Sequence, residues 1–409
     1  MQRAIKTRTL IYLLLLPVLL LPGHSCRRKE KGIESKPAVD SLIIPRDSLT
    51  MFRGNPAHTF YGSGKAPRKV RLLWKFKTGY ILEGEKEKRG VDPKMVWMGV
   101  AWSGQPAIIG DTLVFGSCDG KLYCLNKNTG ELLWKYKCDH SIKSSPTIYK
   151  NKVYFGARDN YLHCVSLKDG KLVWKRKIGN DMDSSPCIIN DTIYVGGEDH
   201  YIYCFTCDSG KVVWKTEVEG SVESSVAVID TFLYAGSAKG YLYCLSRRNG
   251  NILWKFKTGS DTDVSPVIIG DLLYFGSEGG WMFCLNRLTQ KVVWKYKTIG
   301  RVISTPAVVE NRIYFGSGDG IFHCLSADSG KIIWKFKTDG GIWSSPCVSD
   351  SMIVFGSRSG KIYCLTSEGN LVWTFPTGGV INATPALINN RIYCGSHDGY
   401  LYCLGSDTL

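Results

Sequence analysis

Apolar and polar residues alternate in short runs along most of the chain. "GKLYCL", residues 120–125, is one such run, and "NYLHCV", "HYIYCF", "GYLYCL", "GWMFCL", "GIFHCL", "GKIYCL" and a second "GYLYCL" follow it. None of these stretches has the apolar spacing of three and four residues that marks an amphipathic helix. The pattern therefore predicts β-strands and no helical domain.

The runs belong to an internal repeat of about 40 residues, marked by tryptophan. Trp134, Trp174, Trp214, Trp254, Trp294 and Trp334 recur every 40 residues, and Trp373 follows 39 residues later. Each copy holds four β-rich runs separated by Gly-, Asp- and Asn-containing turns, which are typical of hairpins. Each copy is therefore predicted to be a four-stranded antiparallel meander.

The arrangement of the repeats predicts the fold class. Runs such as "LYCL" are apolar on both faces, so other sheets must pack on both sides of each copy. A period near 40 with four strands per copy is typical of a β-propeller. Eight strands carry the repeated cysteine, but only seven are followed by a tryptophan strand, and the eighth tryptophan, Trp74, comes before the first copy. We predict an all-β, eight-bladed propeller whose N-terminal strand around Trp74 joins the C-terminal blade and closes the ring.

The repeated cysteines raise the question of chemistry. They lie at one position of eight blades, at Cys124, Cys164, Cys204, Cys244, Cys284, Cys324, Cys364 and Cys403. Neighbouring copies are expected to be too far apart for disulfides, so we interpret the eight as a circle of small, buried, apolar side chains. "CFTC", residues 204–207, has the spacing of a zinc ligand pair, but no second pair matches it. We predict no metal site from the cysteines.

The N-terminus resembles an export signal. Arg3, Lys6 and Arg8 precede the apolar "IYLLLLPVLLL", and "PGHSC" follows. We predict a signal peptide over residues 1–25, lipidation at Cys26, a flexible charged tether over 26–50 and the propeller over 51–409. The alternative at Cys26 is a secreted protein with an unmodified thiol.

Charge adds little to this prediction. The formal net charge of +16 falls to +13 without the three basic residues of the signal, and much of the rest lies in lysines of the repeated "WKxK" strands. Lysines spread evenly around a ring favour protection of edge strands over a nucleic-acid patch. We therefore predict no nucleic-acid partner.

Two features of the sequence indicate a family. The repeat contains "W-K-x-K-T-G", "S-S-P", "Y-C-L" and "T-G-K-x-x-W", and the segment that opens the domain reads "MFRGNPAHTFYGSG" at residues 51–64. In both features the chain resembles the pyrroloquinoline-quinone-like propeller family. The resemblance implies this fold and two alternative functions. Quinoprotein dehydrogenases of the family have catalytic insertions and adjacent cysteines, whereas this chain has no Cys-Cys pair and seven lean blades. The BamB-type lipoproteins of outer-membrane protein assembly match in outline.

A candidate site lies in the turns between consecutive blades, which share one face of a propeller. The residue three before each first-strand proline, or its equivalent, reads Ser103, Lys143, Asp183, Glu223, Asp263, Ile303, Trp343 and Asn382. Two positions earlier, Asp181 and Asp261 add to an acidic arc on three consecutive blades. The arc of Asp181, Asp183, Glu223, Asp261 and Asp263, with Trp343, is predicted to bind a hard cation or a basic partner. The alternative is that each acid is solvated separately in a short turn.

A second candidate is the one long insertion, about 20 residues between Trp74 and Pro106. A single long loop on a lean ring is often functional, and Met95, Trp97 and Met98 are candidates for docking a partner. The alternative is a plug that caps a blade.

These features favour a non-catalytic envelope protein that needs no cofactor. We expect it to face the periplasm and to be anchored by lipid to the outer membrane. We expect it to bind envelope proteins, with the outer-membrane β-barrel assembly machinery as a candidate partner. The alternatives are an enzyme, a quinoprotein dehydrogenase that binds pyrroloquinoline quinone (PQQ) with calcium, and an envelope sensor of carbohydrate or peptide.

Overall fold

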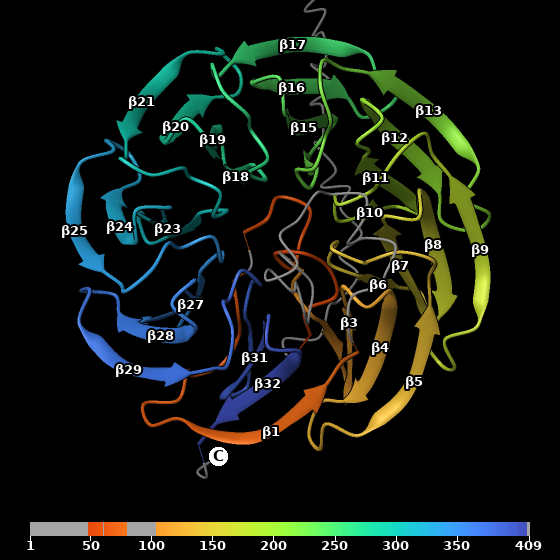
Figure 1. The fold of residues 1–409 in the computed structure, drawn as a ribbon. Coiled ribbons are helices and arrows are strands. Elements are labelled where there is room, and N and C mark those ends of the chain that lie inside the picture. The colour runs from red at the N-terminus through yellow and green to blue at the C-terminus, as the bar shows by residue number, and fades with distance from the viewer. Residues whose placement is uncertain (1–47, 60, 80–103, 407–409) are drawn as a thin grey trace, which may run out of the picture. The chain divides into compact units, whose positions relative to one another are not determined.

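The computed structural model describes residues 48–59, 61–79 and 104–406 of the chain. These residues form 32 strands in eight four-stranded antiparallel sheets arranged around a centre, and they contain no helix (Figure 1). The prediction of an all-β, eight-bladed propeller is confirmed. The predictions for the signal, the anchor at Cys26 and the loop residues Met95, Trp97 and Met98 fall outside the described residues.

Each blade runs from a short inner strand to a long outer strand. The first four blades, in chain order, are β2 (Ala107–Ile109), β3 (Thr112–Gly116), β4 (Lys121–Asn126) and β5 (Leu132–Lys137); β6 (Thr147–Tyr149), β7 (Lys152–Ala157), β8 (Tyr161–Ser166) and β9 (Leu172–Lys177); β10 (Cys187–Ile189), β11 (Thr192–Gly196), β12 (Tyr201–Thr206) and β13 (Val212–Glu217); and β14 (Ala227–Ile229), β15 (Phe232–Ser237), β16 (Tyr241–Ser246) and β17 (Ile252–Lys257).

Blades 5 to 7 repeat this pattern, and blade 8 combines the two ends of the chain. Their strands are β18 (Val267–Ile269), β19 (Leu272–Ser277), β20 (Trp281–Asn286) and β21 (Val292–Lys297); β22 (Ala307–Val309), β23 (Arg312–Gly316), β24 (Ile321–Ser326) and β25 (Ile332–Lys337); β26 (Cys347–Ser349), β27 (Met352–Gly356), β28 (Lys361–Thr366) and β29 (Leu371–Pro376); and β30 (Ala386–Ile388), β31 (Arg391–Ser396) and β32 (Tyr400–Gly405) with β1 (Arg71–Lys77).

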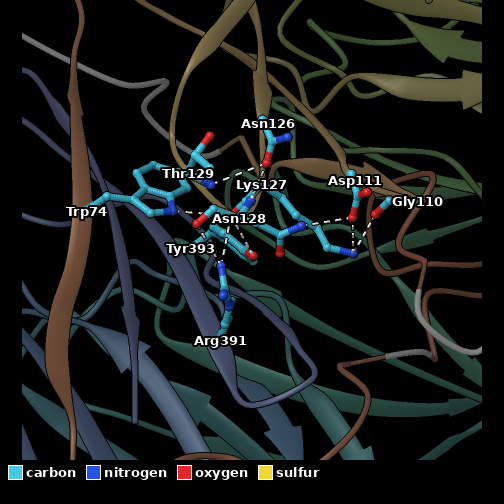
Figure 2. A network of polar contacts seen from close by, with 9 residues as sticks. All are labelled: Trp74, Gly110, Asp111, Asn126, Lys127, Asn128, Thr129, Arg391 and Tyr393. Carbon is cyan, nitrogen blue, oxygen red and sulfur yellow. Dashed lines mark hydrogen bonds and ion pairs between the residues drawn. The ribbon is translucent and has the colours of Figure 1, made fainter. Parts of the chain in front are cut away.

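The ring closes as predicted, because β1 pairs with β32 and places Trp74 opposite Cys403. Figure 2 shows the seam between blades 8 and 1, where the carbonyl oxygen of Lys127 accepts hydrogen bonds from Trp74 Nε1 (3.2 Å), Tyr393 Oη (3.1 Å) and Arg391 Nη1 (3.4 Å). Beside it, Asn128 Nδ2 donates to Asp111 Oδ1 at 2.9 Å. Three donors from blade 8 therefore meet one turn of blade 1.

Seven of the eight outer-strand tryptophans bond the next blade in the same way. Trp134 Nε1 donates to the carbonyl of Leu167 at 2.8 Å, and its ring lies against Gly170, where a Cβ atom would come within 2.5 Å of it. Among the described residues, Trp254 is the outer-strand tryptophan without such a bond, and its neighbouring turn has Gln290 (φ 60°) in place of the glycine. Glycine is therefore suited to this turn for two reasons: it adopts the left-handed backbone conformation, and it leaves room for the indole ring.

The eight repeated cysteines are 0–1% exposed. All fourteen cysteines of the described residues are free and buried, which confirms the interpretation of the circle as packing. Burial raises the pKa of each of the eight repeated thiols to about 12. Their chemistry is therefore that of small hydrophobic residues.

Several edge lysines have a second role besides edge protection. Lys175 Nζ lies 4.4 Å from the ring centroid of Tyr161, and Lys215 and Lys255 lie over Tyr201 and Tyr241 in the next two blades. These cation–π contacts bind the outer strand of a blade to its third strand and stabilise by about 0.5–1 kcal/mol each at exposed positions.

The segment before β1 lies inside the ring, against the innermost strands. Leu49 pairs with Ile108 of blade 1, and the carbonyl oxygens of Pro56 and Ala57 accept from the amides of Val228 and Ile268 in blades 4 and 5. Arg53 is fully buried, and its two terminal nitrogens donate to the carbonyls of Thr305 and Pro346 at 2.5 Å each. Residues 48–59 and 61–66, the inner segment, thus satisfy backbone groups that the short first strands leave open.

Candidate functional site

Two kinds of turn form one face of the propeller, called the cavity face because a cavity opens there. The inter-blade turns, such as residues 178–186, join a fourth strand to the next first strand, and the inner hairpin turns, such as residues 197–200, join second and third strands. Because antiparallel strands alternate in direction, both kinds lie at the same end of every blade. Glu198 N accordingly donates to the carbonyl of Asp181 at 2.9 Å.

A cavity of about 370 Å³ opens at this face. Its upper wall includes Lys143, Asp183, Glu223, Asp263, Ile303, Trp343 and Asn382, the ring of inter-blade residues predicted from the sequence, with Glu278 and Arg301 beside them. Ser103 of that ring is outside the described residues. The turn positions therefore meet at one site, and Asp181 and Asp261 lie in the same turns.

Small polar side chains line the lower part of the cavity, above the inner segment. These are the second residues of the Ser-Ser-Pro motifs and their equivalents, Ser185, Ser225, Ser265, Thr305, Ser345 and Thr384, and Phe52 of the inner segment joins them. Ser185 N donates to Ser225 Oγ (3.2 Å), and Ser225 N donates to Ser265 Oγ (2.9 Å). The motif thus forms a belt of hydrogen bonds from one blade to the next, a role that its position before each first strand did not reveal.

The acids of blade 3 are ion-paired and are not separately solvated. Arg158 Nε donates to Asp183 Oδ1 at 2.8 Å, Arg158 Nη2 donates to Glu198 Oε1 at 3.1 Å, and Arg158 Nη1 lies 3.4 Å from Asp181 Oδ2. Lys143 Nζ lies 3.4 Å from Asp183 Oδ2. Two cations from blade 2 therefore neutralise this part of the arc.

The pKa values follow these contacts. Burial opposes the ionisation of Asp183, but Lys143 and Arg158 outweigh it and lower its pKa. Burial first and Asp183 second raise the pKa of Glu198 to about 8 and of Glu223 to about 7. Glu198 and Glu223 therefore take up protons more readily than free carboxyl groups do.

The acids of blade 5 have fewer partners. Asp261, Asp263 and Glu278 place carboxylate oxygens within 4.8 Å of one another. Burial first, then Glu223 and Asp261, raise the pKa of Asp263 to about 10. Arg301 Nη1 contacts Glu278 Oε2 at 3.0 Å, but the Arg301 side chain is 62% exposed.

The opposite wall of the cavity is aromatic and amide. The guanidinium carbon of Arg358 lies 3.9 Å from the ring centroid of Trp343, so one face of the indole is covered. Asn382 is 2% exposed, and its Nδ2 lies 3.3 Å from Nε2 of His397. Trp343 therefore does not present a bare ring to the cavity.

The inner hairpin turns supply residues that the sequence analysis missed. Arg158, Glu198, Glu278 and Arg358 occupy one position of the repeat, one or two residues after the end of the second strand. That position varies between copies (Cys118, Arg158, Glu198, Ala238, Glu278, Gly318, Arg358, His397), and its variation beside the constant strands is the signal that could have identified it.

The two histidines of the third strands pack against phenylalanine rings. His163 stacks on Phe155 with ring centroids 5.0 Å apart, and its Nε2 contacts Asp159 at 3.1 Å. His323 stacks on Phe315 and contacts Ser317 Oγ through Nε2 at 2.9 Å. Both rings replace the usual tyrosine or phenylalanine of this position.

The fold and its repeats define a β-propeller of the pyrroloquinoline-quinone-like class. The family described as "Beta-alanine-activating enzyme, beta-propeller" matches residues 182–408, more than half of the chain, and the chain belongs to this propeller family. The family described as "Outer membrane protein assembly factor BamB" matches residues 67–179. None of the curated proteins compared with the chain matches it.

Solved structures of both functional branches resemble the propeller. BamB from Moraxella catarrhalis is 18% identical with a TM-score of 0.68, covering 83% of this chain and 100% of that one. A europium-containing methanol dehydrogenase is 12% identical with a TM-score of 0.73, covering 88% of this chain and 98% of that one. Quinohemoprotein alcohol dehydrogenase from Comamonas testosteroni is 12% identical with a TM-score of 0.73, covering 90% and 82%. At these identities the structures show a shared fold, and function must be argued from the site.

Within the described residues, the structure contains no helix with the length and apolar character that crossing a membrane requires.

Proposed function

We propose that the chain is a non-catalytic binding scaffold of the bacterial cell envelope that engages a partner protein through the cavity face. The observation that carries this proposal is the gathering of Asp183, Glu223, Asp263 and Glu278 at one cavity built from turns. Behind this cavity the inner segment, with the buried Arg53, packs against the first strands. Loops on a rigid ring are suited to recognition, because the scaffold fixes their positions.

The charges of the wall indicate the chemistry of the partner. Lys143 and Arg301 are the cations of the described cavity lining, and each contacts one of its carboxylates. Glu223 and Asp263 make no ion pair within the described residues, and a cation placed beside them would lower their raised pKa values, so the wall favours a basic segment. The BamB family match supports an envelope location and a partner in outer-membrane protein assembly. The lipid anchor at Cys26 and docking through Met95, Trp97 and Met98 remain parts of this proposal.

A second candidate is a quinoprotein dehydrogenase, favoured by the carboxylate clusters because calcium prefers such oxygen ligands. The residues around the cavity fit a hard cation but not the quinone. PQQ is a flat tricarboxylate, and it would face four carboxylates, while Arg358 already covers one face of Trp343. An envelope sensor of carbohydrate or peptide would use the same cavity.

Affinity capture from gently solubilised envelopes tests the scaffold proposal. The full-length protein is compared with a triple variant, Glu223→Gln, Asp263→Asn and Glu278→Gln. The matched control is Asp230→Asn, Asp271→Asn and Asp350→Asn, which neutralises three acids in the turns between first and second strands, at the other end of the blades.

Recovery of a barrel-assembly component with the full-length protein and the control, but not with the cavity variant, supports the proposal. Recovery of no envelope protein, together with uptake of PQQ and calcium seen by absorbance, would favour the enzyme.

A further inference from the structure

Two identical sets of carboxylates occupy equivalent turns two blades apart. Asp181, Asp183 and Glu198 form the blade 3 triad, and Asp261, Asp263 and Glu278, each 80 residues later, form the blade 5 triad. The backbone is equivalent too, because Glu198 N donates to the carbonyl of Asp181 at 2.9 Å and Glu278 N to that of Asp261 at 2.8 Å. The two triads can therefore be compared position by position.

The cations that fill the blade 3 triad have no counterpart at the blade 5 triad. Arg158 reaches all three carboxylates of blade 3 from the inner hairpin turn of blade 2, and Lys143 reaches Asp183. The residues 80 positions later, on blade 4, are Ala238 and Glu223. The turns coincide, since the amides of Arg158 and Ala238 donate to the carbonyls of Ser141 and Ser221 at 2.9 and 3.0 Å. The blade 5 triad thus has alanine where a guanidinium would enter, with one further acid.

Buried acceptors are left without donors as a result. The Oδ1 atoms of Asp261 and Asp263 are inaccessible to solvent and have no hydrogen-bond partner among the described residues. Burial of a carboxylate oxygen without a donor is unfavourable. The raised pKa of Asp263 agrees with this, since burial and the neighbouring acids favour its protonated form.

An independent acceptor lies on the opposite wall of the same cavity. Asn382 is 2% exposed, lines the cavity, and its Oδ1 has no hydrogen-bond partner among the described residues. This side chain belongs to blade 8 and takes no part in the acidic arc. The cavity therefore lacks hydrogen-bond donors on two separate walls.

We propose that the cavity binds a guanidinium group, held by Asp261, Asp263 and Glu278 in the position that Arg158 occupies on the blade 3 triad. Guanidinium fits because its planar fork donates to several carboxylate oxygens at once, as Arg158 does to Asp183 and Glu198. This inference rests on the proposed scaffold function, and it identifies the group that the partner presents as an arginine side chain. Glu223 adds charge from blade 4, and Arg301 contacts Glu278 from the exposed rim.

Calorimetric titration of the full-length protein tests the site. The probes are N-acetyl-arginine-N-methylamide, which presents the side chain as a peptide does, free L-arginine, the blocked lysine analogue and calcium chloride. We expect the blocked arginine to bind at least tenfold more tightly than the blocked lysine, because lysine cannot donate as a planar fork. Binding of free arginine with similar affinity would indicate a metabolite as a second source of the group.

Substitution of Ala238 by arginine is the sharpest variant. Ala238→Arg should place an internal guanidinium on the blade 5 triad, raise the melting temperature and weaken blocked-arginine binding at least tenfold. Lys239→Arg, which adds a guanidinium at the next, exposed position of the same turn, is the matched control and should leave binding unchanged. Unchanged binding in Ala238→Arg, with a melting temperature no higher than that of the unmodified protein, overturns the assignment, as does calcium binding without arginine binding.

The guanidinium site and the scaffold function can be disproved independently of each other. If an envelope partner is captured equally well by Ala238→Arg and by the unmodified protein, the scaffold function stands and the guanidinium site is not its contact. If blocked arginine binds and Ala238→Arg abolishes this binding, but no envelope protein is captured, the site stands and the scaffold function does not.

Discussion

Trp74, on the first strand, and Tyr393, near the C-terminus, donate hydrogen bonds to the same atom, the carbonyl oxygen of Lys127. The two residues come from opposite ends of the propeller sequence and meet blade 1 together (Figure 2). The ring is therefore closed by side-chain contacts as well as by the pairing of β1 with β32.

Loss of Trp74 should destabilise the whole ring. Trp74→Ala removes a large aromatic contact and one hydrogen bond, so we expect a loss of about 3–5 kcal/mol in the free energy of unfolding. Tyr393→Phe removes only a hydrogen bond and should cost about 1 kcal/mol. Urea unfolding measures both losses, and hydrogen exchange should show β1 and β32 opening first in Trp74→Ala. Equal losses for the two variants would contradict this account.

Gln290 offers a stabilising substitution. It occupies a left-handed turn position (φ 60°) that is glycine at 130, 170, 210, 250 and 330. Gln290→Gly should raise stability by about 1 kcal/mol and allow Trp254 to bond the next turn. The reverse change, Gly170→Ala, brings a Cβ atom within 2.5 Å of Trp134 and should destabilise.

Gly270→Ala is the matched control for Gly170→Ala. It has φ +56° but no atom within 4 Å of the added Cβ, so it isolates backbone strain from the clash. Calorimetry should rank Gly170→Ala well below Gly270→Ala in melting temperature. The same melting temperature for both would show that the contact with the indole has no role.

Removal of Arg158 should be costly. Arg158→Ala leaves Asp181, Asp183 and Glu198 without their main cation in a half-buried site, and we expect a loss of about 3–5 kcal/mol in the free energy of unfolding. Arg301→Ala removes a cation that is 62% exposed and should cost less than about 1 kcal/mol. Chemical denaturation of both variants tests this, and a loss of under 1 kcal/mol for Arg158→Ala would show that the ion pairs contribute little.

Stability should fall as pH rises because of Asp263. Its pKa is raised to about 10 in the folded protein and is about 3.9 in an unfolded chain. The folded state therefore holds a proton that the unfolded state releases, and the associated stability, complete below pH about 4, is lost progressively as pH rises towards 10. Asp263→Asn should thus gain stability relative to the unmodified protein as pH rises from 5 to 9. The same difference in melting temperature between Asp263→Asn and the unmodified protein at pH 5 and at pH 9 would contradict this account.

The repeated cysteines should be unreactive in the folded state. With pKa values raised to about 12 and almost no exposure, they should resist iodoacetamide at pH 8. Mass spectrometry should find Cys124 and its seven equivalents alkylated only after unfolding. Alkylation of any of them in the native protein would indicate local opening of that blade.

The sequence by itself determined the number of blades, the way in which the ring closes, and which turn residues lie around the cavity. Eight cysteine strands from Cys124 to Cys403, of which seven are followed by a tryptophan strand, together with the early Trp74, required eight blades and a shared last blade. Strand direction then placed Asp183, Glu223, Asp263 and Trp343 on one face. These are properties of backbone periodicity. A repeat displays them directly, because every copy packs against its neighbours in the same way.

Only the tertiary structure decided how the side chains pair. Arg158 neutralises the blade 3 triad while Ala238 leaves the blade 5 triad open, and Arg53 lies buried at Thr305 and Pro346, more than 250 positions later in the chain. These contacts cross blade boundaries, and their geometry depends on distances between sheets. A residue's position in the repeat says which face it occupies, but long charged side chains reach partners that only the closed ring brings near.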